Sequence, residues 1–112
     1  MLCYHIHITG SVYKTGYRYF LKENAARLNI TGCVFYFPDH SAGIISIGEE
    51  KNLKEFISLC ISGNLDSRVI NVEIKTIPQL QLDSFEVINE NEPENTTLNE
   101  IIQSINNNNY EN

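Results

Sequence analysis

Hydrophobic and polar side chains alternate at the start of the chain, which predicts a β-strand at residues 2–9. Successive side chains of a strand point to opposite faces of a sheet, so this strand has one apolar face and one largely polar face. The first face carries Leu2, Tyr4, Ile6 and Ile8, and the second carries Cys3, His5, His7 and Thr9. Alternation, or a high content of β-branched and aromatic residues, predicts further strands at residues 31–37, 42–48, 68–76 and 84–88.

Two other segments have apolar residues at helical spacing. Between Tyr19 and Asn29 a single apolar stripe recurs every three or four residues, and the helix itself is expected to begin near Tyr17. Residues 50–62 give the stronger pattern, and Gly63 supplies a stop signal. The stripe residues are Leu21, Ala25 and Leu28 in the first helix, and Leu53, Phe56, Ile57, Cys60 and Ile61 in the second.

The resulting order, β-α-β-β-α-β with a further short strand at the end, predicts an α+β fold. It is the order of the ferredoxin-like α/β sandwich, in which two helices cover one face of an antiparallel sheet. The opposite face would then meet solvent, which suits the polar set on the first strand. We expect His5 and His7 to be exposed strand histidines rather than metal ligands, because no third ligand stands at a suitable spacing.

The composition changes near residue 90. Residues 89–112 contain nine asparagines, five glutamates and no basic residue, a composition that cannot bury enough apolar surface to fold alone. We therefore predict a folded domain at residues 1–90 and a flexible tail at residues 91–112. A loosely docked amphipathic helix through Leu98, Ile101, Ile102 and Ile105 is the alternative for part of that tail.

The net charge of −6 is concentrated in the C-terminal third. Residues 1–75 hold eight bases and seven acids, whereas residues 76–112 hold seven acids and no base, so a local anion site is not excluded. The three cysteines are odd in number and form no C-x-x-C pair, which favours reduced, buried thiols. The chain shows neither a membrane span nor a signal peptide, and we expect it in the cytoplasm, with no membrane partner.

The segment GSVYKTGYRYF, residues 10–20, joins the first strand to the first helix. Unpaired amides and the positive end of the helix dipole collect at a helix N-terminus, and Gly16 can turn amides inward. Arg18 offers a planar fork that suits phosphate or carboxylate, and Lys14 adds a second charge. These features predict an anion site, while an ordinary turn with two solvated bases is the alternative.

The same segment resembles the signature of the acylphosphatase family, G-x-V-Q-G-V-G-[FY]-R-x-F. The resemblance continues at the family's spacing over roughly residues 3–88, for example at Gly32-x-Val34, Pro38-Asp39 and Gly48. The residues that match the signature itself are Gly10, Val12, Gly16, Tyr17, Arg18 and Phe20.

The resemblance implies hydrolysis of the carboxyl–phosphate bond of an acyl phosphate, without a metal or an organic cofactor. It also implies that loop amides and the signature arginine hold the phosphate, while an asparagine on the second strand orients the attacking water. The expected partner is an acyl phosphate or another small anion, and we expect a monomer. The implied phosphate-binding set is Tyr13, Lys14, Thr15, Gly16, Tyr17 and Arg18, and the catalytic candidates are Arg18 and Tyr36.

Tyr36 marks the main departure from the family pattern, because it stands where the family has the water-positioning asparagine. A phenol can donate and accept hydrogen bonds, but its oxygen lies several ångströms further from the backbone than a carboxamide. The alternative hypothesis is therefore a degenerate module that binds an anion or a protein partner without turnover. RNA binding through Phe35, Tyr36 and Phe37 is not expected, because the basic patch is small and no RNA-binding aromatic motif occurs.

Overall fold

The computed structural model describes residues 1–78 and 80–89, and it confirms the predicted order of elements. The tail predicted at residues 91–112 lies outside the described residues. Neither of the two described helices is both long and apolar enough to cross a membrane. The elements are β1 (Leu2–Ser11), α1 (Tyr17–Arg27), β2 (Thr31–Tyr36), β3 (Ala42–Gly48), α2 (Glu50–Ser62), β4 (Arg68–Thr76) and β5 (Phe85–Val87).

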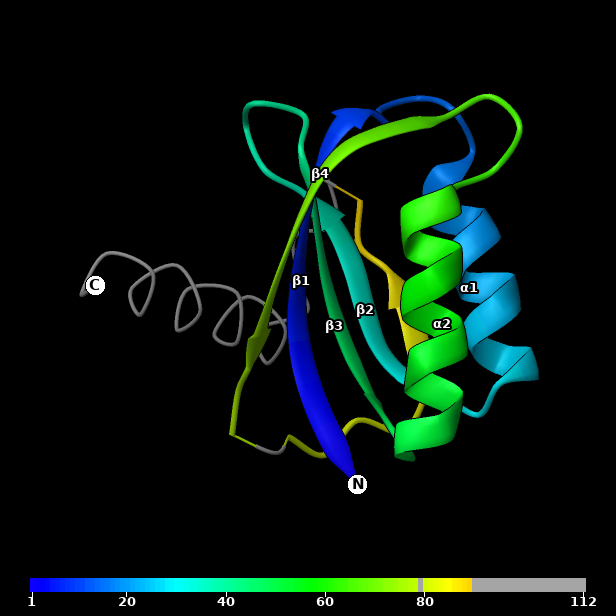
Figure 1. The fold of residues 1–112 in the computed structure, drawn as a ribbon, viewed down its shortest axis with the longest axis vertical. Coiled ribbons are helices and arrows are strands. Elements are labelled where there is room, and N and C mark those ends of the chain that lie inside the picture. Colours follow the sequence, from blue (N-terminus) through cyan, green and yellow to red (C-terminus); the bar gives the residue numbers. More distant parts are fainter. Residues whose placement is uncertain (79, 90–112) are drawn as a thin grey trace.

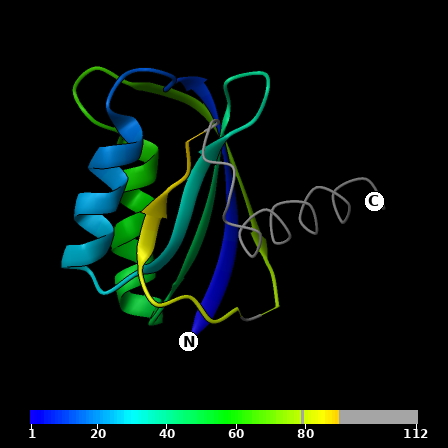
Figure 2. The same cartoon turned by 180° about the vertical axis from the view of Figure 1, so that it is seen from behind.

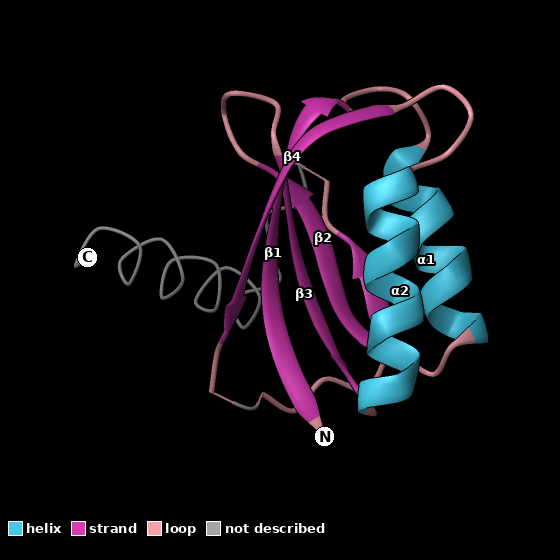
Figure 3. Cartoon of the chain, viewed as in Figure 1, coloured by secondary structure: helices cyan, strands magenta, loops and turns pink. Residues whose placement is uncertain are grey.

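The five strands form one sheet in the order β4-β1-β3-β2-β5, with both helices packed on the same face (Figures 1 and 3). The first four strands pair antiparallel, as the ferredoxin-like fold requires. β5 instead pairs parallel with β2, so the complete sheet is mixed rather than purely antiparallel. The register places Val34 beside Val87, and this pairing fixes which residues of β2 and β5 are neighbours near the loop.

The main core lies between the sheet and the two helices. Ile6 and Ile8 of β1 are fully buried there, as the alternating pattern predicted. They pack in one cluster with Leu21 of α1 and Phe56 of α2. Complete burial of such side chains contributes about 1.5–3 kcal/mol each, so this layer supplies much of the stability that holds the β1–α1 loop in place.

The opposite face of the sheet is less exposed than the sequence predicted. His5 is only 4% exposed, so the expectation of an exposed histidine is wrong at this position, although Thr9 is exposed. The same face of the sheet carries a second apolar cluster, and hydrophobic side chains of the connection between β4 and β5 pack against it. Figure 2 shows the path of this connection. The buried members of the cluster are Cys3, Cys33, Phe35, Ile45 and Ile47, and the connection contributes Ile77, Leu80 and Leu82.

All three cysteines are free and buried, which confirms the interpretation of their spacing. Burial raises the pKa of Cys33 to about 12 and raises the pKa of Cys3 and of Cys60 above the ordinary value. The thiols are therefore protonated and shielded near neutral pH, and they offer no nucleophile.

Burial of His5 should make the stability of the fold depend on pH. Burial, and then the positive neighbours His7 and Lys75, lower the pKa of His5 to about 4. The unfolded chain binds a proton at a pKa near 6.5, so acid favours unfolding between those two values. We expect the free energy of unfolding to fall by about 2–3 kcal/mol between pH 7 and pH 4.5 from this group alone. Urea unfolding at both pH values, with His5→Gln as the comparison, measures the difference, and an identical loss in both proteins would contradict the assignment.

Candidate active site

The loop between β1 and α1 has two residues in the left-handed backbone conformation. Lys14 has φ 60° and Gly16 has φ 80°, with Thr15 between them. Alternation of left-handed and ordinary residues turns consecutive main-chain amides toward one side and forms a concave cradle for an anion. Gly16 also caps α1, and no described side chain caps that N-terminus, so the positive end of the helix faces the same cradle.

Side chains from three parts of the chain hold the carbonyl groups of this loop. The Thr15 hydroxyl donates to the carbonyl oxygen of Val12 over 2.7 Å, and the Tyr36 hydroxyl donates to the same oxygen over 2.7 Å. Asn64, which follows α2, donates through Nδ2 to the carbonyl oxygen of Thr15, also over 2.7 Å. These bonds engage carbonyl oxygens with protein donors and stabilise the loop conformation. The sequence analysis did not identify Asn64 as a site residue, because it lies about fifty residues from the loop along the chain.

Arg18 lies in the first turn of α1, half-buried, with its guanidinium held beside the loop. Nη1 donates to the carbonyl oxygen of Ile88 over 3.1 Å and to Oδ1 of Asn89 over 3.0 Å. The guanidinium carbon is 4.6 Å from the centroid of the Tyr36 ring, a cation–π distance. Both of these hydrogen bonds use Nη1, and the guanidinium also hydrogen-bonds to the Tyr36 hydroxyl.

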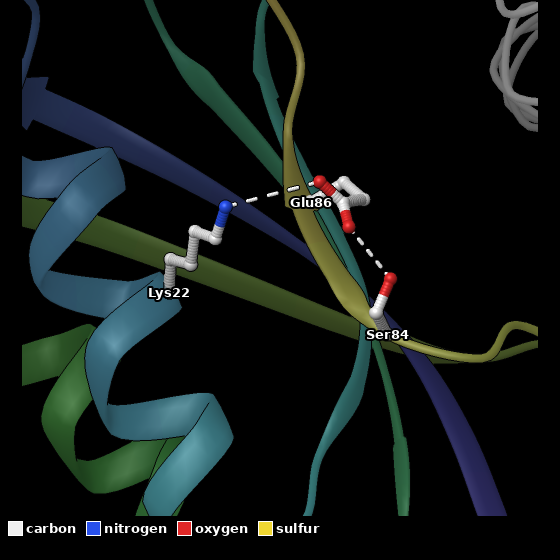
Figure 4. A network of polar contacts seen from close by, with 3 residues as sticks. All are labelled: Lys22, Ser84 and Glu86. Atoms are coloured by element: carbon white, nitrogen blue, oxygen red, sulfur yellow. Dashed lines mark hydrogen bonds and ion pairs between the residues drawn. The ribbon is translucent and has the colours of Figure 1, made fainter.

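A second contact joins α1 to β5 one helical turn further on. Lys22 lies 3.9 Å from Oε2 of Glu86, and the Ser84 hydroxyl donates to Oε1 of the same carboxylate over 2.6 Å (Figure 4). The pair is half exposed, so it contributes little to stability. It lies next to the contact that Arg18 makes with Ile88 and Asn89, just after β5.

The Tyr36 phenol is engaged by the loop itself. Besides donating to Val12, its oxygen accepts a hydrogen bond from the main-chain amide of Lys14. Burial raises the pKa of Tyr36, and the charge of Arg18 and the Lys14 amide offset that rise only in part, so the phenol is neutral near pH 7. We expected the Tyr36 hydroxyl to handle water. In the structure this hydroxyl is already hydrogen-bonded to two groups of the loop.

The remaining predicted residues divide between the loop surface and the core. Tyr13 packs edge-to-face on Tyr36 at a centroid distance of 4.9 Å and stacks on His40 at 3.8 Å. The Lys14 ammonium lies 5.4 Å from the centroid of the Tyr13 ring. Tyr17 differs, because its side chain is fully buried and its hydroxyl donates to the carbonyl oxygen of Cys60. Only the main-chain amide of Tyr17 can therefore take part in anion binding.

The cradle, the arginine and the surrounding fold can be compared with known proteins. A sequence model of the acylphosphatase family matches residues 4–87. The chain belongs to the acylphosphatase family. The match includes the whole loop, both helices and all five strands apart from Leu2 and Cys3 of β1.

Individual acylphosphatases agree with this assignment. The chain is 37% identical over 87 residues to an acylphosphatase of Archaeoglobus fulgidus, covering 78% of this chain and 98% of that protein. It is 35% identical over 86 residues to an acylphosphatase of Clostridium acetobutylicum, covering 76% of this chain and 94% of that protein. A crystal structure of acylphosphatase from Bacillus subtilis superposes with a TM-score of 0.76 at 27% identity, over 80% of this chain and all of that chain.

The structure shows how the loop accommodates Lys14, which departs from the acylphosphatase signature. Lys14 occupies the position of the signature's middle glycine, and it adopts the left-handed conformation that a glycine takes without strain. For a residue with a Cβ, this conformation is about 1–2 kcal/mol less favourable than the right-handed one. The loop geometry is thus kept at Lys14 in spite of the substitution, and the lysine adds a positive charge next to the cradle.

Proposed function

We propose that this acylphosphatase-family chain hydrolyses acyl phosphates, with the phosphoryl group bound in the loop at residues 12–18. The observation that carries the proposal is the position of Arg18. It is half-buried and anchored through one nitrogen at the edge of a cradle that contains two left-handed residues. Main-chain amides, the N-terminus of α1 and a guanidinium are the donors that binding of a phosphoryl group requires.

The proposed reaction needs charge stabilisation and positioning more than covalent chemistry. Water adds to phosphorus, and the bond from phosphorus to the acyl oxygen breaks, so that the electron pair leaves on the carboxylate. One proton of the water stays on the phosphate and the other goes to solvent. Arg18 and the amides stabilise the charge on the phosphoryl oxygens as these bonds change, which is the kind of contribution that preorganised donors make most effectively.

Hydrolysis of benzoyl phosphate by the purified full chain tests the proposal. We expect hydrolysis above the uncatalysed rate and competitive inhibition by inorganic phosphate, which occupies the same cradle. Hydrolysis no faster than in buffer would contradict the proposal. If phosphate still bound in that case, the chain would be an anion-binding module without turnover.

Replacing the Tyr36 hydroxyl tests whether the phenol competes with the ligand. In Tyr36→Phe the Lys14 amide loses an intramolecular acceptor, so it becomes available to a phosphate oxygen. One hydrogen bond of about 1 kcal/mol predicts an inhibition constant for phosphate about fivefold lower. The lost bond to Val12 should lower the free energy of unfolding by about 1 kcal/mol. Inhibition assays and urea unfolding measure both changes, and weaker phosphate binding would show that the phenol is itself a ligand.

A further inference from the structure

The loop between β1 and α1 carries a cation whose charge the proposed function has not yet used. Lys14 shapes the cradle through its left-handed backbone, whereas its side chain is exposed to solvent. The ion pairs among the described residues involve Lys22, Arg27 and Lys54 instead. The Lys14 ammonium contacts a ring, that of Tyr13, at 5.4 Å from its centroid. Within the described residues this ammonium therefore has no carboxylate partner.

Two strained residues meet at the Tyr13 ring. The described chain has three non-glycine residues with positive φ, and two of them, Lys14 at 60° and His40 at 69°, contact this ring. His40 stacks on it at a centroid distance of 3.8 Å and an interplanar angle of 11°. Non-glycine residues with such backbone strain cluster at active sites and ligand clamps, where the strain is part of the function. We call Tyr13, Lys14 and His40 the loop rim.

The loop rim lies within reach of the proposed phosphate-binding arginine. The guanidinium carbon of Arg18 is 4.6 Å from the centroid of the Tyr36 ring. The centroids of Tyr36 and Tyr13 are 4.9 Å apart, and Lys14 Nζ is 5.4 Å from the Tyr13 centroid. These contacts place the two cationic groups at most about 15 Å apart. The flexible stem of an exposed lysine can shorten this separation.

The charge at the loop rim is not neutralised by the turn between β2 and β3. Asp39 is the acidic residue of that turn, next to His40. Its carboxylate accepts hydrogen bonds from the main-chain amide of Ser41 over 3.0 Å and from the Ser41 hydroxyl. It forms no ion pair with Lys14 in the part of the chain that the structure describes. A ligand with one anionic group in the cradle and another at the rim would therefore meet a cation at each end.

We propose that the loop rim is a second anion subsite, in which the Lys14 ammonium binds a distal carboxylate of the acyl group, so that the chain prefers acyl phosphates of dicarboxylic acids. The inference rests on the proposed function and deepens it by naming the class of substrate. In an extended succinyl phosphate the distal carboxylate lies about 7 Å from phosphorus. A charge-assisted hydrogen bond of about 2.8 Å at each end keeps the total span within the separation of the two cations.

Succinyl phosphate and butyryl phosphate test this preference, because they differ in the distal carboxylate and share the length of the acyl chain. After division by the uncatalysed rates, kcat/KM for succinyl phosphate should be about fivefold higher, the contribution of one exposed ion pair. The difference should lie in KM, because the distal carboxylate takes no part in the bond changes. It should shrink as ionic strength rises from about 0.05 M to about 0.5 M.

Variants of Lys14 assign the preference to its ammonium. Lys14→Asn removes the charge and introduces a residue that tolerates the left-handed conformation, so the ratio of the two kcat/KM values should fall to about one. Lys14→Arg keeps the charge and should keep the preference. The matched control is Lys54→Gln on α2, where the lysine side chain is 77% exposed, and its ratio should equal that of the parent protein. A ratio cancels any change in hydrolysis that is common to both substrates.

Two results would overturn the inference and leave the proposed function intact. The parent protein could hydrolyse both substrates with a ratio of one or less, or Lys14→Asn could keep the ratio of the parent. Failure of the proposed function looks different, because the parent protein would then hydrolyse neither substrate. The inference would fail together with the proposed function in that case.

Discussion

Replacement of Arg18 by alanine should lower kcat/KM for benzoyl phosphate by about 10³-fold, the largest effect on activity that we expect. The guanidinium supplies the side-chain charge at the cradle, held by Ile88 and Asn89 on one nitrogen and by the Tyr36 ring beneath it. Its removal leaves the main-chain amides and the end of the α1 dipole as the remaining ligands of the phosphoryl group. Competitive inhibition by inorganic phosphate should also weaken in Arg18→Ala, because the guanidinium binds the phosphate group both in the ground state and in the transition state.

Arg27→Ala is the matched control, since it removes the same charge from the same helix. Arg27 lies in the last turn of α1, where it is 57% exposed and 3.6 Å from Glu55. We expect the activity of Arg27→Ala to stay within about twofold of that of the parent protein, because an exposed ion pair contributes little to stability. Arg18→Lys is informative as well, because an ammonium keeps the charge but loses the planar fork. Full activity of Arg18→Ala would exclude the cradle as the active site.

Replacement of Gly32 by alanine should destabilise the fold by more than about 3 kcal/mol, the largest effect on stability that we expect. Gly32 has φ 141°, and a Cβ there would lie 1.8 Å from the carbonyl oxygen of Ile45. Neither atom can move easily, because β2 is paired on both sides, with β3 and β5. The consequence reaches the site, since β2 ends at Tyr36, whose hydroxyl donates to the carbonyl oxygen of Val12 in the loop.

Gly16→Ala separates backbone strain from the steric clash. Gly16 also has a positive φ of 80°, but a Cβ there would meet Nδ2 of Asn64 at 3.5 Å, an ordinary contact. Only the left-handed conformation is then unfavourable, and we expect a loss of about 1–2 kcal/mol. Urea unfolding of the two variants measures the difference. Equal losses would mean that β2 shifts to accommodate the new methyl group.

The elements of the fold could be predicted from the sequence because each has its own periodicity. The alternation at residues 68–76 and the apolar stripe at residues 50–62 correspond to β4 and α2 with the predicted bounds. β1 extends to Ser11, beyond the predicted residue 9, because it continues to pair with β4 past an irregularity between Thr9 and Gly10. The parallel pairing of β5 was not predictable, since it depends on how the chain returns across the sheet.

Burial of His5 escaped prediction for a related reason. Its strand has a polar second face by sequence, but a connection more than seventy residues further along the chain packs on the apolar cluster there. The local alternation of apolar and polar residues contains no information about which distant segment packs on a face of the sheet. It fixes only which side chains share a face, and that part of the prediction is confirmed by the buried Ile6 and Ile8.

The candidate site was predictable only as far as it is local. Gly16 and Arg18 stand in one loop, where spacing and residue type already indicate an anion cradle. Asn64 and Asn89 come from distant segments and reach the loop through the ends of α2 and β5. The left-handed conformation of Lys14 was also missed, because lysine gives no sequence signal for positive φ.

A phosphate titration of the ¹⁵N-labelled chain, followed by NMR, tests the central claim most directly. The claim is that the main-chain amides of the loop and the guanidinium of Arg18 bind the phosphoryl group together. We predict saturable shifts of the amides of residues 14–17 and of the Arg18 side-chain Nε–H, and their loss in Arg18→Ala. The account would be contradicted if these signals stayed unchanged and the shifted signals came instead from residues around the polar hollow lined by His5, His7, Glu73 and Lys75.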